Sequence, residues 1–192
     1  MKTNSILRIF AALTIVLGFA MTTVGQQSAN ASVAGNANVA AQVTVTGNTP
    51  LEFGNVTPGV TKTVSSAGVV GPGLPGGTTE TAGKFTITKG ANTQVTLGFT
   101  LPSNLVDLSS NNLAINFVDY AGPTKCAKLS YTALTDVPFT PASGEVIANT
   151  GSTATYFAST EFYVFIGGTV VPITGQVAGA YTGTITLTAT YN

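Results

Sequence analysis

Carboxylates are the side chains through which this 192-residue chain could hold a metal ion or perform acid–base chemistry. Asp107 and Asp119 are the pair we single out, because two carboxylates that meet in space can hold a calcium ion. The chain has no Asp-x-Asp-x-Asp calcium loop, however, and carboxylates on loops and sheet edges are usually solvated. The sequence therefore favours two solvent-exposed charges over a calcium site.

Nucleophilic catalysis has little support in the sequence. The chain contains no histidine, which removes Ser-His and Cys-His pairs, histidine bases and histidine metal sites. A glycine-rich segment before Lys84 superficially resembles a phosphate-binding loop. Gly77 lies one residue too far from Gly83, and Phe85 stands where a metal-binding hydroxyl is needed. We therefore predict a protein that is not an enzyme and that uses no cofactor or metal.

The remaining side chains of interest are one cysteine and several aromatic residues. Cys126 is the only cysteine, so no intramolecular disulfide can form, and a small buried role is favoured over a reactive or intermolecularly paired thiol. The aromatic residues could form a stacking platform for a sugar, although aromatics in β-proteins are more often core or cross-strand pairs. They are Tyr120, Tyr131, Tyr156, Phe162 and Tyr163.

Residues 1–25 have the features of a secretory signal peptide. Lys2 and Arg8 precede an uncharged apolar run at 9–20. Cleavage is expected after residue 25, or as late as residue 31. The alternative is an uncleaved anchor, but the run is short for a span of about 20 residues. We expect the mature protein not to span a membrane, and to pass through the periplasm to the cell surface or beyond.

Removal of the signal peptide leaves an acidic chain with few cations. Five lysines and seven carboxylates remain, a net charge of −2, and no arginine is left. So few cations neutralise few phosphates, which argues against nucleic-acid binding.

Alternation of apolar and polar residues, rich in threonine and valine, predicts strands throughout the mature chain. The expected strands are 33–46, 51–56, 60–65, 84–89, 93–101, 113–120, 128–132, 161–166, 169–173 and 181–191. Residues 90–92 would close a hairpin between the strands on either side of them, and residues 167–168 would supply another turn. With no helical stripe outside the signal peptide, the pattern predicts one all-β, mostly antiparallel sandwich.

The motifs on these strands resemble domain-of-unknown-function family 4402, which is similar to the spore coat protein U group of archaic chaperone–usher pilins. The resemblance covers roughly residues 38–192. The matching segments are 51–56, 83–88, 95–102, 167–170 and 179–183, followed by Tyr191 next to the C-terminus. The resemblance implies an immunoglobulin-like, pilin-like sandwich at 42–192 that lacks its last strand.

The C-terminal stretch 179–192 resembles the terminal signature of pilus subunits. In such proteins the final strand pairs first with a periplasmic chaperone and later forms one wall of a groove for the neighbouring subunit. The resemblance thus implies neighbouring subunits as partners, with a chaperone and an outer-membrane usher. The candidate assembly residues are Gly179, Tyr181, Gly183, Ile185, Leu187, Ala189 and Tyr191.

The stretch 26–41 is then a candidate N-terminal extension that donates a strand to a neighbour. Its candidate groove-filling residues alternate: Val33, Gly35, Ala37 and Val39. Alternatively the run is only the first strand of the domain behind a leader, because alternation alone does not identify the pairing partner. Two functions follow: a fibre subunit assembled by strand donation, or a secreted binding domain that completes its own sandwich and recognises glycan or protein. A third is an enzyme accessory or envelope stress protein.

Overall fold

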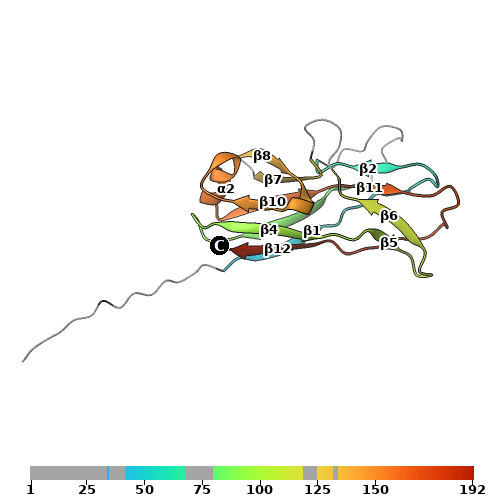
Figure 1. The fold of residues 1–192 in the computed structure, drawn as a ribbon, viewed down its shortest axis with the longest axis horizontal. Coiled ribbons are helices and arrows are strands. Elements are labelled where there is room, and N and C mark those ends of the chain that lie inside the picture. Colours follow the sequence, from blue (N-terminus) through green and yellow to red (C-terminus); the bar gives the residue numbers. More distant parts are fainter. Residues whose placement is uncertain (1–33, 35–41, 68–79, 119–124, 132–133) are drawn as a thin grey trace, which may run out of the picture. The chain divides into compact units, whose positions relative to one another are not determined.

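Short antiparallel strands make up most of the computed structural model (Figure 1). The residues that the structure describes are 34, 42–67, 80–118, 125–131 and 134–192. All described strands and helices lie in one unit, Val39–Asn192. Every strand pairing among them is antiparallel, which confirms the predicted all-β character.

The largest sheet has five strands in the order β1-β3-β10-β7-β8. Their bounds are Thr44–Thr49, Gly83–Thr88, Glu161–Ile166, Ala127–Tyr131 and Leu134–Phe139, respectively. β1 and β8 are the edges. The sequence pattern missed β8 because Pro138 interrupts it, but an edge strand tolerates a proline that a central strand would exclude.

Two smaller sheets complete the described strands. One has the order β2-β11-β6-β5, with bounds Lys62–Val64, Gly168–Val171, Asn112–Asn116 and Asn104–Val106. The other has the order β12-β4-β9, with bounds Thr186–Tyr191, Val95–Thr100 and Glu145–Ile147. Three short helical turns lie before and after β9: η1 at Pro141–Ser143, η2 at Gly151–Thr153 and α2 at Ala154–Ala158. They are too short to leave a periodic signal in the sequence.

The hairpin predicted across residues 90–92 is wrong. β3 pairs with β1 and β10, whereas β4 pairs with β12 and β9, so the connection crosses between sheets. The physical reason is Lys89, which is buried and donates hydrogen bonds to the carbonyl oxygens of Phe157 at 2.7 Å and Ser159 at 2.8 Å. These bonds tie the connection to the end of α2, and burial lowers the pKa of Lys89.

The turn predicted at residues 167–168 is also wrong, although both flanking strands are present. The chain runs from β10 in the five-stranded sheet into β11 in the four-stranded sheet, and the two strands do not pair. A Cβ on Gly167 would lie 2.2 Å from the carbonyl oxygen of Val64, so only glycine fits this passage. Cys126 is fully buried beside it, with its Sγ 3.0 Å from the carbonyl oxygen of Gly167, in agreement with the predicted buried role.

Two apolar clusters hold the sheets together. The first lies between the five-stranded and three-stranded sheets and includes Ile87, Leu97 and Phe162. The second joins the four-stranded sheet to the segments beside it. Phe85 and Phe99 pack against both clusters, with ring centroids 6.1 Å apart in an edge-to-face arrangement. This sheet-on-sheet packing is the sandwich-like character that the sequence predicts.

A buried ion pair links β2 to the segment before β3. The Lys62 ammonium lies 2.6 Å from a carboxylate oxygen of Glu80, and the two side chains are 4% and 3% exposed. Lys62 also donates to the main-chain carbonyl of Asn55 at 2.8 Å. Removing one partner of a buried pair strands the other charge away from water.

We therefore expect Lys62→Met to lower the free energy of unfolding by about 3–5 kcal/mol in urea denaturation. The double variant Lys62→Met/Glu80→Leu should recover most of that loss, because it buries no unpaired charge. A single variant that loses less than about 1 kcal/mol would place the pair in solvent instead.

Tyr156 provides a pH-dependent test of the core. Its buried hydroxyl donates to the carbonyl of Thr135 at 2.9 Å, and burial, with a smaller effect of Asp136, raises its pKa to about 12. The unfolded chain therefore loses this proton first, so the stability that it contributes is present below about pH 10 and is lost as the pH rises to about 12.

We expect Tyr156→Phe to be less stable than the parent by about 0.5–1.5 kcal/mol at neutral pH, through the lost hydrogen bond. This difference should shrink between about pH 10 and 12, because ionisation of the tyrosine in the unfolded chain lowers the free energy of unfolding of the parent and not of the variant. Other titrating groups are common to both proteins and cancel in the comparison. A difference that stays constant across this range would contradict the assignment.

Candidate assembly edge

The C-terminal strand β12 is paired along one side only. It runs antiparallel to β4, from Thr186 opposite Thr100 to Tyr191 opposite Val95. Within the described part of the chain, no strand pairs with its other side. An edge of this kind presents a row of main-chain donors and acceptors to any strand that can approach it.

The inner side of this edge strand is apolar and its outer side is polar. Leu187 is 6% exposed and belongs to the first core cluster, and Ala189 and Tyr191 pack against that cluster. Ile185, just before the strand, packs against the second cluster. The residues between them are exposed threonines: Thr186, Thr188 and Thr190. β12 therefore closes the core with one face, and one side of its backbone has no strand partner among the described residues.

The first half of the predicted C-terminal strand is not a strand in the structure. Before Thr186 only Thr182 forms a bridge, to Val106. A Cβ on Gly183 would lie 2.7 Å from the side chain of Leu105, which explains the glycine. The Tyr181 hydroxyl donates to the carbonyl of Val177 at 2.7 Å. This segment and the exposed Gly179 thus form a loop packed on β5 and the turn after it.

The C-terminal end of β12 is fixed to its surroundings. The Tyr191 hydroxyl accepts a hydrogen bond from the Gly90 main-chain N–H at 3.1 Å. The Asn192 side-chain amide donates to the Thr96 hydroxyl at 2.6 Å. The penultimate tyrosine therefore has a role within its own domain: it anchors the free edge to the β3–β4 connection.

The other terminal strand, β1, is also an edge and lies next to β12. It pairs only with β3, and several of its Cα atoms lie within 8 Å of Cα atoms in β12, which belongs to a different sheet. Half-buried apolar side chains on or next to β1, on β12 and on the strands paired with them pack against the first core cluster. They are Val43, Val45, Phe85, Phe99, Ala189 and Tyr191. Phe85 and Phe99 were not among the sequence candidates, although each has the parity of the buried residues on its strand.

Several of the remaining sequence candidates fall outside the part of the chain that the structure describes. The donor candidates Val33, Gly35, Ala37 and Val39 lie outside the described residues, as do Asp119 and Tyr120.

Asp107 is a turn residue in the structure. It accepts hydrogen bonds from the main-chain N–H groups of Ser109 and Asn111, at 2.9 and 2.8 Å, and from the Asn111 side chain at 2.8 Å. The bond from the Asn111 side chain, followed by the main-chain bonds, lowers the pKa of Asp107. Its carboxylate thus closes the β5–β6 turn. Among the described residues no group of His, Cys, Asp and Glu could hold a metal ion.

The aromatic residues do not form one platform. Tyr156 and Phe162 are fully buried, with ring centroids 5.6 Å apart in an edge-to-face pair. Tyr131 and Tyr163 form a half-buried cross-strand pair 6.1 Å apart. The core and cross-strand roles favoured by the sequence are confirmed for these four residues.

No family model matches the chain, and no curated protein matches it at a significant level. Over the described residues, the structure has no helix with the length and apolar content needed to traverse a bilayer.

The inward and outward positions of β12 offer a matched pair of variants. Leu187→Ala should lower the free energy of unfolding by about 2–5 kcal/mol, because it opens a cavity in the core. Thr188→Ala, one residue along and exposed, should change it by less than about 0.5 kcal/mol. Equal losses in chemical denaturation would mean that the strand does not present alternate faces to core and solvent.

Proposed function

We propose that this protein is a non-enzymatic, exported structural subunit that polymerises into a pilus- or fimbria-like surface fibre by donor-strand complementation. The observation that carries the proposal is that one side of β12 has no strand partner among the described residues, while half-buried apolar side chains lie on β12 and on the neighbouring β1. The resemblance to family 4402 and to spore coat protein U–type pilins points to the same mechanism.

The strand order supports an immunoglobulin-like sandwich that is one strand short. In that fold one sheet has the order A-B-E-D and the other has strand F between C and G. The order β1-β3-β10-β7 corresponds to A-B-E-D, and β4 and β12 correspond to C and F. Strand G would lie on the free side of β12. This is the position that a donated strand fills in strand-addition complexes.

The N-terminal extension at 26–41 is the proposed donor. Its odd positions from Val33 to Val39 carry only small or branched apolar residues and one glycine, which suits a groove with one shallow pocket. Residues 40–43, which join it to β1, read Ala-Ala-Gln-Val and contain none of the Gly, Pro, Asn or Asp that favour a chain reversal. This favours donation to a neighbouring molecule over folding back onto the same one.

An unfilled edge also explains why partners during export are part of the proposal. Exposed strand edges promote aggregation, so a periplasmic chaperone would cover β12 until an outer-membrane usher exchanges it for the neighbour's extension. The alternative is a secreted domain that completes its own sandwich and binds glycan or protein as a monomer.

Fibre formation in the producing cell tests the proposal. Val33→Asp and Gly35→Arg should abolish sodium-dodecyl-sulfate-resistant ladders in unheated surface extracts and remove fibres from electron micrographs. The physical reason is that burying an unpaired charge in an apolar groove costs about 4 kcal/mol or more.

The even positions supply matched controls. Ala34→Asp and Asn36→Arg carry the same new charges on the opposite face of the donor strand, and they should leave ladders and fibres intact. Normal ladders from both odd-position variants would refute strand donation. A wild-type protein that is a stable monomer in light scattering, without ladders, would favour the binding-domain alternative.

A further inference from the structure

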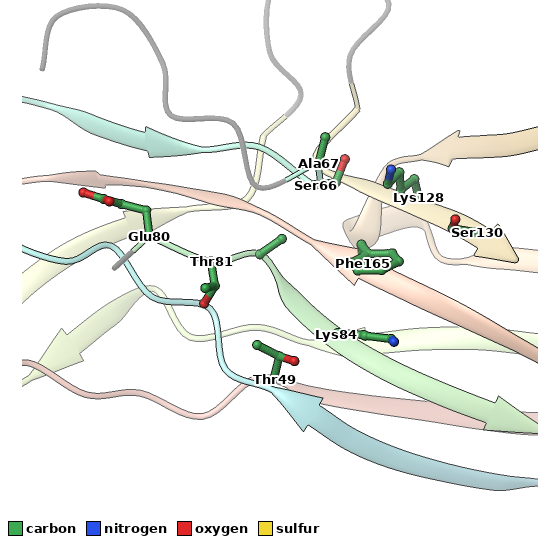
Figure 2. A pocket seen from close by; sticks show the side chains of 10 residues that line it. Thr49, Ser66, Ala67, Glu80, Thr81, Lys84, Lys128, Ser130 and Phe165 are labelled. Carbon is green, nitrogen blue, oxygen red and sulfur yellow. The ribbon is translucent and has the colours of Figure 1, made fainter. Parts of the chain in front are cut away.

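The five-stranded sheet carries a pocket on the face that points away from the core. Its volume is about 390 Å³, and its lining includes Phe165, Lys84, Lys128, Ser130 and Thr49 (Figure 2). This volume falls at the lower end of the roughly 300–1,000 Å³ that small-molecule sites occupy. The pocket is separate from the free edge of β12, since its lining comes from the five-stranded sheet and from the segments after β2 and before β3, and includes no residue of β12.

The floor of the pocket is an aromatic ring between two lysines. Phe165 lies on the central strand β10, directly opposite Lys84 on β3 and Lys128 on β7. Its neighbours Val164 and Ile166 are fully buried, so the Phe165 side chain points outward, where it is half-buried. An outward position on a sandwich strand is ordinarily polar. A phenyl ring here provides an apolar surface that no core requires.

The ammonium of Lys84 is available to a ligand. It lies 3.8 Å from the ring centroid of Tyr163 and 5.8 Å from that of Phe165. In the described part of the chain it makes no ion pair and no hydrogen bond. Cation–π contacts hold the group in place without neutralising its charge. A carboxylate could therefore bind it without first displacing a protein anion.

Lys128 contributes a second, partly neutralised cation. Its ammonium lies 5.3 Å from the Phe165 ring centroid and 2.7 Å from a carboxylate oxygen of Asp136, whose side chain is 45% exposed. The other acid of the pocket, Glu80, is bound to the buried Lys62. Neither acid is placed to neutralise Lys84.

The surface cations of the chain are concentrated around this pocket. After Arg8 the chain has five lysines and no arginine. Lys62 and Lys89 are buried. Of the other three, Lys84 and Lys128 line the pocket, and the carbonyl of Lys125 accepts a hydrogen bond from Ser66 in its wall. Lys84, which has no anionic partner among the described residues, can therefore attract an anionic ligand to this pocket.

We propose that the pocket binds a carboxylated sugar unit of an acidic polysaccharide. The C–H face of a pyranose ring packs on Phe165 through dispersion contacts, its carboxylate binds Lys84, and its hydroxyls reach Ser130 and Thr49. A nucleic acid fits less well, because two or three lysines without an arginine neutralise few phosphates. The proposal holds for a monomer and for a fibre subunit, since strand donation takes place elsewhere.

Calorimetric titration of the purified protein tests this site with three carboxylated probes: tetragalacturonate, tetramannuronate and sialyllactose. At least one should bind, and its uncharged counterpart, with the carboxyl group reduced to an alcohol, should bind at least about tenfold more weakly because it lacks the charge-assisted contact. Absence of binding by all three probes would overturn the proposal, as would equal binding of the uncharged counterpart.

Two variants locate the binding in the pocket. Lys84→Gln and Phe165→Thr should each weaken binding by about tenfold or more, because each removes one of the two main contacts. Lys125→Gln removes one positive charge from a residue that does not line the pocket and touches its wall only through the main chain, and should weaken binding by no more than about threefold through the long-range field. Thermal unfolding must be unchanged in the variants used. If Lys84→Gln has no larger effect than Lys125→Gln, binding is diffuse attraction and the assigned site is wrong.

Discussion

The structure depends on one constraint: β12 must cover the core with its inner face while one side of its backbone has no strand partner among the described residues. Main-chain donors and acceptors along an edge need either water or another strand. Half-buried apolar side chains lie on β12 itself, at Ala189 and Tyr191, and at the neighbouring strand β1, at Val43 and Val45, so a strand added beside β12 would also cover apolar surface. Hydrogen bonding and apolar burial therefore favour the same completion of the sheet.

Local pattern predicted most of the strands, and tertiary contacts decided how they pair. Strands 83–88, 95–100 and 161–166 were expected within two residues, because threonine and branched residues alternate there. The mistaken hairpin has a single cause: buried Lys89 ties the connection to α2, and a lysine in sequence suggests solvent. The second half of the predicted C-terminal strand, Thr186–Tyr191, is a strand in the structure. The loop before it was not expected, because glycines such as Gly179 and Gly183 occur both in irregular strands and in tightly packed loops.

The charged residues explain why chemistry was hard to locate from sequence. Lys62 and Lys89 look like surface charges in the sequence, yet both are buried and bind a carboxylate or main-chain carbonyls. Asp107 looks like a possible metal ligand and instead closes a turn. Only the register of β3, β10 and β7 brings Lys84, Phe165 and Lys128 side by side, and residues 37 or more positions apart cannot be aligned without that register.

The free edge and the outer pocket would reinforce each other in a fibre. Strand addition uses the edge of the three-stranded sheet, whereas the pocket lies on the outer face of the five-stranded sheet. Polymerisation would therefore repeat the pocket once in every subunit without covering it by the donated strand. A shallow site with two lysines and one ring binds a single sugar weakly, but an acidic polysaccharide presents many such units. Repeated weak sites on one fibre can raise the overall affinity by about 10²–10⁴ when several engage together. Assembly would then strengthen the binding that the pocket of each single subunit already provides.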